Sequence, residues 1–239
     1  MSALVGGASI VIFPAMIAAG VSPPIAAASN LVAMMPTVLY SAYWDRTRLP
    51  PFDRTFITLI VTSLAGGLAG AILLSVTSPQ AFQVLVPLLL GVATTLFALG
   101  RPINVWMRKR AMRLHGREPE MGAVGIAVLL PVAVYIGYFG AGAGVMLLAI
   151  FSIWKAGDFR TANVKKNLIA SLNMLAVSLF FIVQGMVDWP ATGVAMAAGF
   201  AGGMVGRRIG RVARQDVMEI VVIVIGSVLT AVYAWRYWF

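Results

Sequence analysis

Two asparagines, Asn30 and Asn167, are the strongest candidates for polar chemistry in a sequence that is otherwise apolar around them. Each follows a short loop at a matching distance, Gly20-Val21-Ser22-Pro23-Pro24 in one case and Gly157-Asp158-Phe159-Arg160-Thr161 in the other. An amide in an apolar helix is costly unless it finds a partner. Each asparagine therefore either contacts a substrate or fastens its helix to a neighbouring turn, and the residues alone fit both interpretations.

Further donors lie close to the two asparagines in the sequence. Ser29 precedes Asn30, while Ser171 and Asn173 follow Asn167 by one to two helical turns, so their hydroxyl and amide groups can face a shared site. Lys166 directly precedes Asn167 and can attract anions, although basic residues in such places more often fix membrane topology. We expect a site for a small anion built from these groups.

Two glycine-rich segments offer a second kind of anion donor. One is Gly6-Gly7-Ala8-Ser9 and the other is Gly140-Ala141-Gly142-Ala143-Gly144. If helices begin there inside a membrane, their first backbone N–H groups are unpaired and the helix dipole favours a negative charge. The alternative is close helix packing through small residues. The backbone candidates for the site are Gly6, Gly7, Ser9, Gly142 and Gly144.

Catalytic chemistry has little support in this sequence. The one histidine, His115, lies in a basic stretch, the chain has no cysteine, and the eight acidic residues fall in loops or at the ends of apolar segments. No metal-binding or nucleophile motif is present, so we expect neither an enzyme nor a cofactor or metal site. The lack of acidic residues inside apolar segments also disfavours the carboxylate relay of many proton and cation transporters.

The composition indicates a membrane protein made of helices. Of 239 residues, 60% are hydrophobic and 11% charged, and the mean hydropathy is +0.91. The apolar runs lack the alternation of barrel strands and are rich in Leu, Ala, Met and Gly. We predict an all-α polytopic fold with the lipid bilayer as its surroundings. The net charge of +10 lies in short clusters beside apolar runs, which does not suit nucleic-acid binding.

The basic residues predict how the chain crosses the membrane. All of them except Arg236 form four groups, at 46–54, 101–117, 155–166 and 207–214, which the positive-inside rule places together in the cytoplasm. This requires residues 121–154 to cross twice, with a turn at Gly140 to Gly144. The predicted spans are 6–19, 25–43, 55–75, 82–100, 121–139, 142–155, 168–184, 190–206 and 217–235.

Recurring glycine motifs predict that the second half of the chain repeats the first, and the distribution of basic residues gives the two halves opposite orientations. Gly6-Gly7 matches Ala143-Gly144, Ala65-Gly66-Gly67-x-x-Gly70 matches Ala201-Gly202-Gly203-x-x-Gly206, and Gly91 matches Gly226. We divide the chain into a first repeat over 1–100, a basic cytoplasmic linker over 101–120 and a second repeat over 121–239. The first repeat lacks a counterpart of 121–139, so we expect a shortened N-terminus. Inverted repeats with interrupted helices are typical of transporters that bind substrate near the bilayer midplane.

The ordered set of these motifs resembles the sulfite exporter TauE/SafE family over nearly the whole chain. The residues that carry the resemblance are Gly6, Gly7, Pro14, Gly20, Asn30, Gly66 and Gly70, with Gly144, Gly157, Asn167, Gly203 and Gly206. The resemblance implies a multi-pass bacterial membrane protein linked to the movement of sulfite, organosulfonates and related sulfur anions.

The sequence as a whole predicts an alternating-access transporter in the bacterial cytoplasmic membrane that exports such an anion. Uptake of the same anions remains open, as does a non-transporting membrane scaffold or assembly factor. The sequence identifies neither the anion, nor a coupling ion, nor the oligomeric state.

Overall fold

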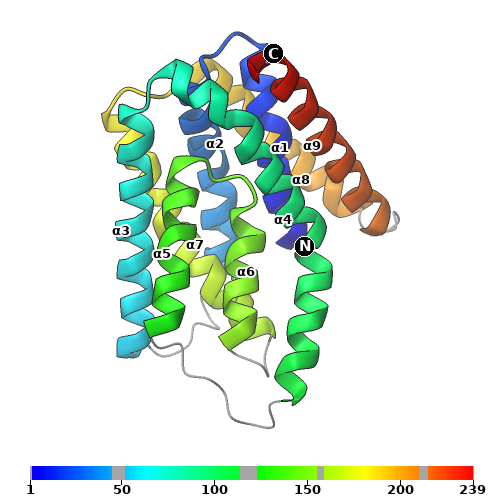
Figure 1. The fold of residues 1–239 in the computed structure, drawn as a ribbon. Helices are drawn as coiled ribbons and strands as arrows, with labels where there is room; N and C mark the ends of the chain where they lie inside the picture. The colour runs from blue at the N-terminus through cyan, green and yellow to red at the C-terminus, as the bar shows by residue number, and fades with distance from the viewer. Residues whose placement is uncertain (1, 45–51, 114–122, 155–158, 210–214, 239) are drawn as a thin grey trace.

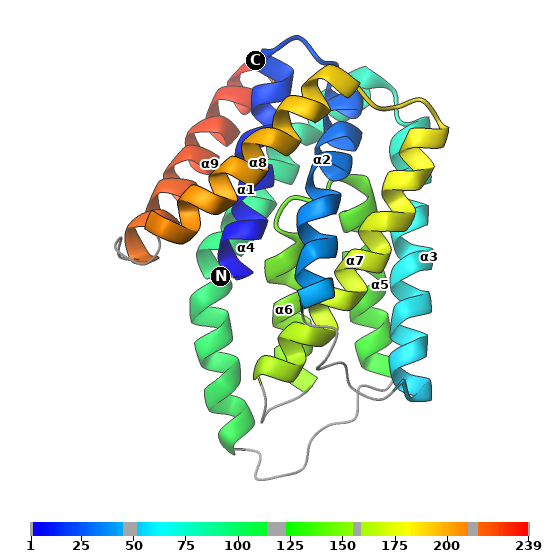
Figure 2. The same cartoon turned by 180° about the vertical axis from the view of Figure 1, so that it is seen from behind.

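The computed structural model describes residues 2–44, 52–113, 123–154, 159–209 and 215–238. Within these residues the chain is a bundle of α-helices (Figures 1 and 2). The helices are α1 (Ser2–Ala18), α2 (Pro23–Trp44), α3 (Arg54–Val76), α4 (Pro79–Arg113), α5 (Ala123–Tyr138), α6 (Ala143–Trp154), α7 (Phe159–Val183), α8 (Trp189–Ile209) and α9 (Gln215–Trp238). The predicted all-α class is confirmed.

Several helices can span a bilayer by length and composition. Of the described helices, five are long and apolar enough, over Pro23–Tyr43, Arg54–Val76, Pro79–Leu96, Val164–Val183 and Ile220–Trp238. Two shorter apolar segments, Ser9–Ala18 and Gly125–Tyr138, fall below the length of a full crossing. The chain is therefore a multi-pass membrane protein, although fewer of its helices reach full spanning length than the nine spans predicted.

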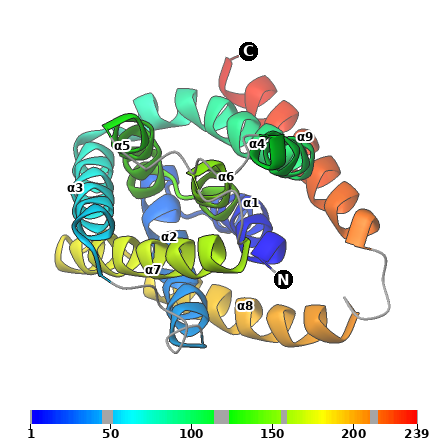
Figure 3. The same ribbon diagram turned by 90° about the horizontal axis from the view of Figure 1, so that it is seen from below.

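The helix ends gather at two ends of the bundle. At the upper end of Figure 1, α1, α3 and α7 finish and α2, α4 and α8 begin. At the lower end α3, α5 and α7 begin and α4 and α6 finish. Seen from below, α1 and α6 lie toward the middle of the molecule, and α2 runs outward from there past α7 (Figure 3). Helix α5 begins at the lower end and α6 finishes there, and the turn that joins them lies within the bundle.

Glycine ends two of these helices at the upper end. Gly20 follows α1 with φ of 92° and Gly185 follows α7 with φ of 67°, a left-handed conformation that side chains disfavour. The N–H groups of Val21 and Met186 reach back to Met16 O and Phe181 O, at 3.1 and 3.0 Å. These bonds pair carbonyls that the helix ends would leave unpaired.

Close packing of α3 on α5 depends on the glycines that the sequence pattern singled out. A Cβ at Gly70 would overlap the carbonyl oxygen of Val134, and one at Gly137 would overlap the carbonyl oxygen of Gly67. A Cβ at Gly66 would lie 2.7 Å from that of Ala133. Gly66, Gly67 and Gly70 therefore form the face of α3 that packs on α5.

Two helices extend beyond their predicted bounds. α4 continues to Arg113, so the first part of the predicted linker over 101–120 is helical, and α7 begins at Phe159 instead of near 168. Arg, Lys, Ala and Met favour helix, so charged residues continue an apolar helix past the membrane without ending it. The remaining linker residues, like Gly157 and Asp158, lie outside the described residues.

Candidate functional site

The turn between α5 and α6 is the feature around which a site can be built. Gly140 and Gly142 have φ of 74° and 77°, and Phe139 and Ala141 are 1% and 0% exposed. Residues on two other helices hold the turn. A Cβ on Gly140 would overlap Cδ2 of Leu31 in α2, and one on Gly142 would lie 3.6 Å from the Cα of Ala93 in α4. Only glycine fits at Gly140.

Helix α6 begins at this buried turn, and carbonyls of the turn pair several of its first amides. The amide of Ala143 bonds Gly140 O at 3.3 Å, and those of Val145 and Met146 bond Gly142 O at 3.0 and 3.2 Å. Gly144 borders open space, since a Cβ placed there would meet nothing within 4 Å. An anion in that space would be favoured by the positive end of the α6 dipole. The predicted candidates Gly142 and Gly144 thus lie at a helix start inside the bundle.

Asn30 lies next to the residue that packs on this turn. It is 1% exposed, and its Oδ1 atom has no hydrogen-bond partner. Its neighbour Leu31 contacts Gly140. Because the oxygen and nitrogen of an amide are assigned from their hydrogen bonds, an unpartnered end can equally present N–H to a ligand. Asn30 is the one predicted side chain with a buried, unpartnered polar atom near the turn.

Ser29 has a structural partner. Its Oγ accepts a hydrogen bond of 2.9 Å from the backbone N–H of Asp188, which precedes α8. The side chain of Asp188 in turn accepts from Ala191 N at 2.9 Å and caps that helix. Ser29 therefore ties the start of α2 to the start of α8.

The predicted residues of α7 lie toward its lower, N-terminal half. Asn167 is half-buried, and Lys166 is only 5% exposed. The Ser171 hydroxyl lies within hydrogen-bonding distance of Asn167 O, at 2.6 Å, and of Val38 O in α2, at 2.9 Å. Both asparagines lie in the first half of their helix, and α2 begins at the upper end whereas α7 begins at the lower end, so Asn30 and Asn167 lie toward opposite ends of the bundle.

Asn173 binds α3 instead of facing the turn. Its Nδ2 atom donates to Ser63 O at 2.6 Å and to Ser63 Oγ at 3.0 Å. A Cβ at Gly67 would lie 2.5 Å from the same Nδ2. The amide of Asn173 therefore occupies the space that a side chain at position 67 would need, and its hydrogen bonds join α7 to α3.

The first glycine segment is placed differently from the second. Gly6 and Gly7 lie inside α1, which is continuous from Ser2 to Ala18, so the helix start predicted at this segment is not seen. Ser9 is 7% exposed in the same helix. Without side chains, the two glycines allow a helix as well as a break, and the sequence pattern does not distinguish them.

The sequence reasoning missed other buried polar groups. Thr94 in α4 and Ser178 in α7 are 6% and 0% exposed, and each has a hydroxyl oxygen without a partner. Both lie in apolar runs with no recurring motif, so nothing in the sequence pointed to them. Asp53 caps α3 through Phe56 N at 2.7 Å, as Asp188 caps α8. Both aspartates cap the amide three residues further on, a spacing that could be read from the sequence.

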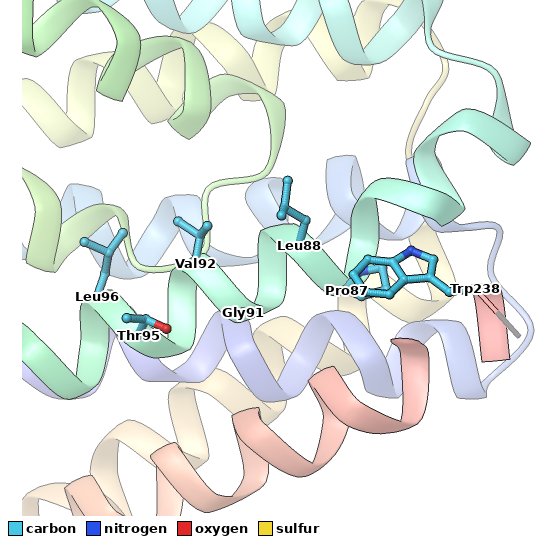
Figure 4. Close-up of a pocket in the computed structure, with 7 residues that line it drawn as sticks. All are labelled: Pro87, Leu88, Gly91, Val92, Thr95, Leu96 and Trp238. Atoms are coloured by element: carbon cyan, nitrogen blue, oxygen red, sulfur yellow. The ribbon is translucent and has the colours of Figure 1, made fainter. Parts of the chain in front are cut away.

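A separate groove of about 510 Å³ lies on α4 beside the end of α9 (Figure 4). Its lining is apolar apart from one hydroxyl and includes none of the predicted residues; the lining residues are Pro87, Leu88, Gly91, Val92, Thr95, Leu96 and Trp238. It offers no positive group to an anion. Among the residues that the structure describes, no cluster of three or more His, Asp or Glu could hold a metal ion.

Comparison with known proteins identifies relatives over nearly the whole chain. The family model described as "Sulfite exporter TauE/SafE" matches residues 1–233. The chain is 25% identical over 233 residues to the "Probable membrane transporter protein YfcA" of Escherichia coli (strain K12), covering 97% of this chain and 83% of that protein.

A "Probable membrane transporter protein" of Haemophilus influenzae is also 25% identical over 233 residues, covering 97% of this chain and 88% of the relative. No solved structure matches the chain. Because the family model covers almost every residue, the chain belongs to the sulfite exporter TauE/SafE family.

Proposed function

We propose that this protein is a transporter of the bacterial cytoplasmic membrane that exports a small anion, sulfite or an organosulfonate, by alternating access. The observation that carries the proposal is the start of α6 at a buried turn, with open space beside Gly144. Backbone N–H groups at such a helix start favour a negative ligand. The family description and the names of the relatives support transport, and the sulfur anion follows the family description.

Asn30 completes the proposed site from the side of α2. Its buried amide has an unpartnered end, and Leu31 beside it packs on the turn that begins the site. A sulfite or sulfonate group carries several acceptor oxygens, which suit amide and backbone N–H donors. Lys166 and Asn167 act in this proposal at the lower approach to the site, where buried Lys166 adds positive charge.

The proposed mechanism uses two inverted repeats, 1–100 and 121–239, joined by the segment 101–120. Helix contacts come in matching pairs, which supports it: α3 packs on α7 as α8 packs on α2, and α4 packs on α6 as α9 packs on α1. α1 runs to the upper end from within the bundle and α6 runs to the lower end (Figure 1). Rocking of one repeat against the other would expose the site to each side in turn.

Transport by purified protein in liposomes tests the proposal. We expect saturable flux of radiolabelled sulfite or a sulfonate, with no flux of a choline cation. Gly144→Asp should lower anion flux about tenfold, which corresponds to about 1.4 kcal/mol of binding free energy, because its carboxylate would occupy the space that the anion needs.

Gly144→Ala is the matched control, because a methyl group meets no atom within 4 Å and should leave flux and melting temperature unchanged. Equal flux in Gly144→Asp and the wild type would contradict the site. Absence of anion flux in the wild type would leave a scaffold or assembly role. Vesicles of defined orientation separate export from uptake.

A further inference from the structure

A cluster of aromatic rings lies between the proposed site and the upper end of the bundle. It consists of Phe13, Phe82, Tyr135, Tyr138 and Phe139, which we call the aromatic seal. The centroids of Phe13 and Phe139 are 5.0 Å apart with planes at 81°, and those of Phe82 and Tyr138 are 5.5 Å apart. Such tilted and edge-to-face pairs are favourable ring contacts.

The seal is buried and is anchored near the upper end. Phe13 and Phe82 are 0% exposed and Phe139 is 1% exposed. The hydroxyl of Tyr138 lies 3.5 Å from Oγ1 of Thr77, the residue that caps the upper end of α3. Phe139 opens the turn that carries Gly140 and Gly142. The rings therefore fill the space between that turn and the upper end.

The first residues of α6 are less buried than the turn before them. Residues 139–143 are buried and Gly144, Val145 and Met146 are half-buried, while Leu147 and Leu148 further down α6 are buried again. α7 packs against α6 and carries basic residues toward the lower end, including Lys165, whose Nζ lies 5.3 Å from the ring centre of Phe56. An anion would be attracted to the space beside Gly144 from this lower, basic end.

The contacts in the seal cross between the two halves of the chain. Phe13 and Phe82 belong to α1 and α4, while their ring partners Phe139 and Tyr138 come from the α5 end and the turn. We propose that the aromatic seal is the gate that closes the site from the exterior, and that it opens when the halves separate. The inference rests on the proposed alternating-access function.

Cysteine labelling tests the gate directly because the chain contains no cysteine. Gly144→Cys places a single thiol in the open space without a clash. The probe is a membrane-impermeant methanethiosulfonate that carries a sulfonate group, applied to vesicles of either orientation. Because the gate opens in each transport cycle, we expect labelling from both faces, with a faster rate from the cytoplasmic face than from the exterior. Adding Phe13→Ala, which removes the ring that contacts both Phe82 and Phe139, should raise the exterior labelling rate toward the cytoplasmic rate.

Phe181→Ala is the matched control, since Phe181 is also 0% exposed but its ring contacts Phe180 and lies outside the seal. It should destabilise the protein as Phe13→Ala does and leave the exterior labelling rate unchanged. Equal labelling rates of Gly144→Cys from the two faces, no labelling from either face, or no rise of the exterior rate in Phe13→Ala would each overturn the gate. Anion flux is measured separately. If the labelling rates differ between the two faces but no flux is detected, the proposed transport of this anion would be wrong and the gate would stand.

Discussion

At the scale of single residues, two buried asparagines differ in what they contact. Asn173 donates to both the backbone oxygen and the hydroxyl of Ser63, so it joins two helices. The Oδ1 atoms of Asn30 and Asn173 both lack a partner. Because Asn173 is already held to α3 through its Nδ2 atom, Asn30 is the better candidate for a ligand.

Substitution by leucine separates these roles. Asn173→Leu should lower the free energy of unfolding by about 1 to 3 kcal/mol, because it leaves polar atoms of Ser63 unpaired. Asn30→Leu should keep or raise the melting temperature while anion flux is lost, and Asn167→Leu should lose flux as well. Detergent melting and liposome flux measure the two quantities on each variant. Normal flux in Asn30→Leu would remove that side chain from the site.

Sequence reasoning found the polar residues but could assign only some of their roles. Asn30, Asn167, Ser171 and Asn173 stand out because amides and hydroxyls are rare in apolar runs. The partner of Asn173 is Ser63, 110 residues away, and no local pattern predicts which helices will meet. The same holds for Ser29, whose partner Asp188 is 159 residues away. Contacts at such separations depend on the tertiary arrangement.

At the scale of helices, the crossing of α3 and α5 shows how glycine sets the distance between elements. Gly67 and Gly70 on α3 meet Gly137 and Val134 on α5 through backbone atoms. Small residues at this spacing are typical of packing faces, since membrane helices associate through close van der Waals contact. The pattern did not reveal the partner, because Gly137 stands in α5 without a second glycine at helical spacing.

Gly137→Ala tests this crossing. The new methyl group would overlap the carbonyl of Gly67, so α5 would have to move away, and we expect a loss of about 1 to 3 kcal/mol in stability. Gly193→Ala in α8 is the control, since a Cβ there meets nothing within 4 Å and alanine favours helix. Thermal melting in detergent compares the two. Equal melting temperatures would show that the crossing is looser than described.

Helix bounds illustrate a different limit of sequence reasoning. The apolar runs predicted where helices lie, and the glycines at Gly20 and Gly140 predicted two of their ends. The sequence did not predict the end of α4 at Arg113 or the start of α7 at Phe159. Apolar runs indicate which residues lie in the membrane, whereas a helix can continue beyond them. Both helices continue into basic segments, where Arg and Lys are good helix formers in water.

At the scale of the whole molecule, the arrangement of the helix ends bears on orientation. Arg54 begins α3 and Arg113 ends α4 at the lower end, and α7 begins there with Lys165 and Lys166 in its first half. The upper end carries Asp188 and the turns at Gly20 and Gly185. By the positive-inside rule we therefore expect the lower end to face the cytoplasm.

Reporter fusions test this orientation in cells. We expect fusions that end after Arg48, Arg110, Arg160 and Arg211 to report the cytoplasm, and one after Asp188 to report the exterior. The critical case is Arg160, because α5 and α6 both meet the lower end and their turn stays inside the bundle. An exterior signal after Arg160 would mean that residues 121–154 cross the membrane once, and the proposed opposite orientation of the two repeats would then be untenable. A cytoplasmic signal after Arg160 requires an even number of crossings between Arg110 and Arg160.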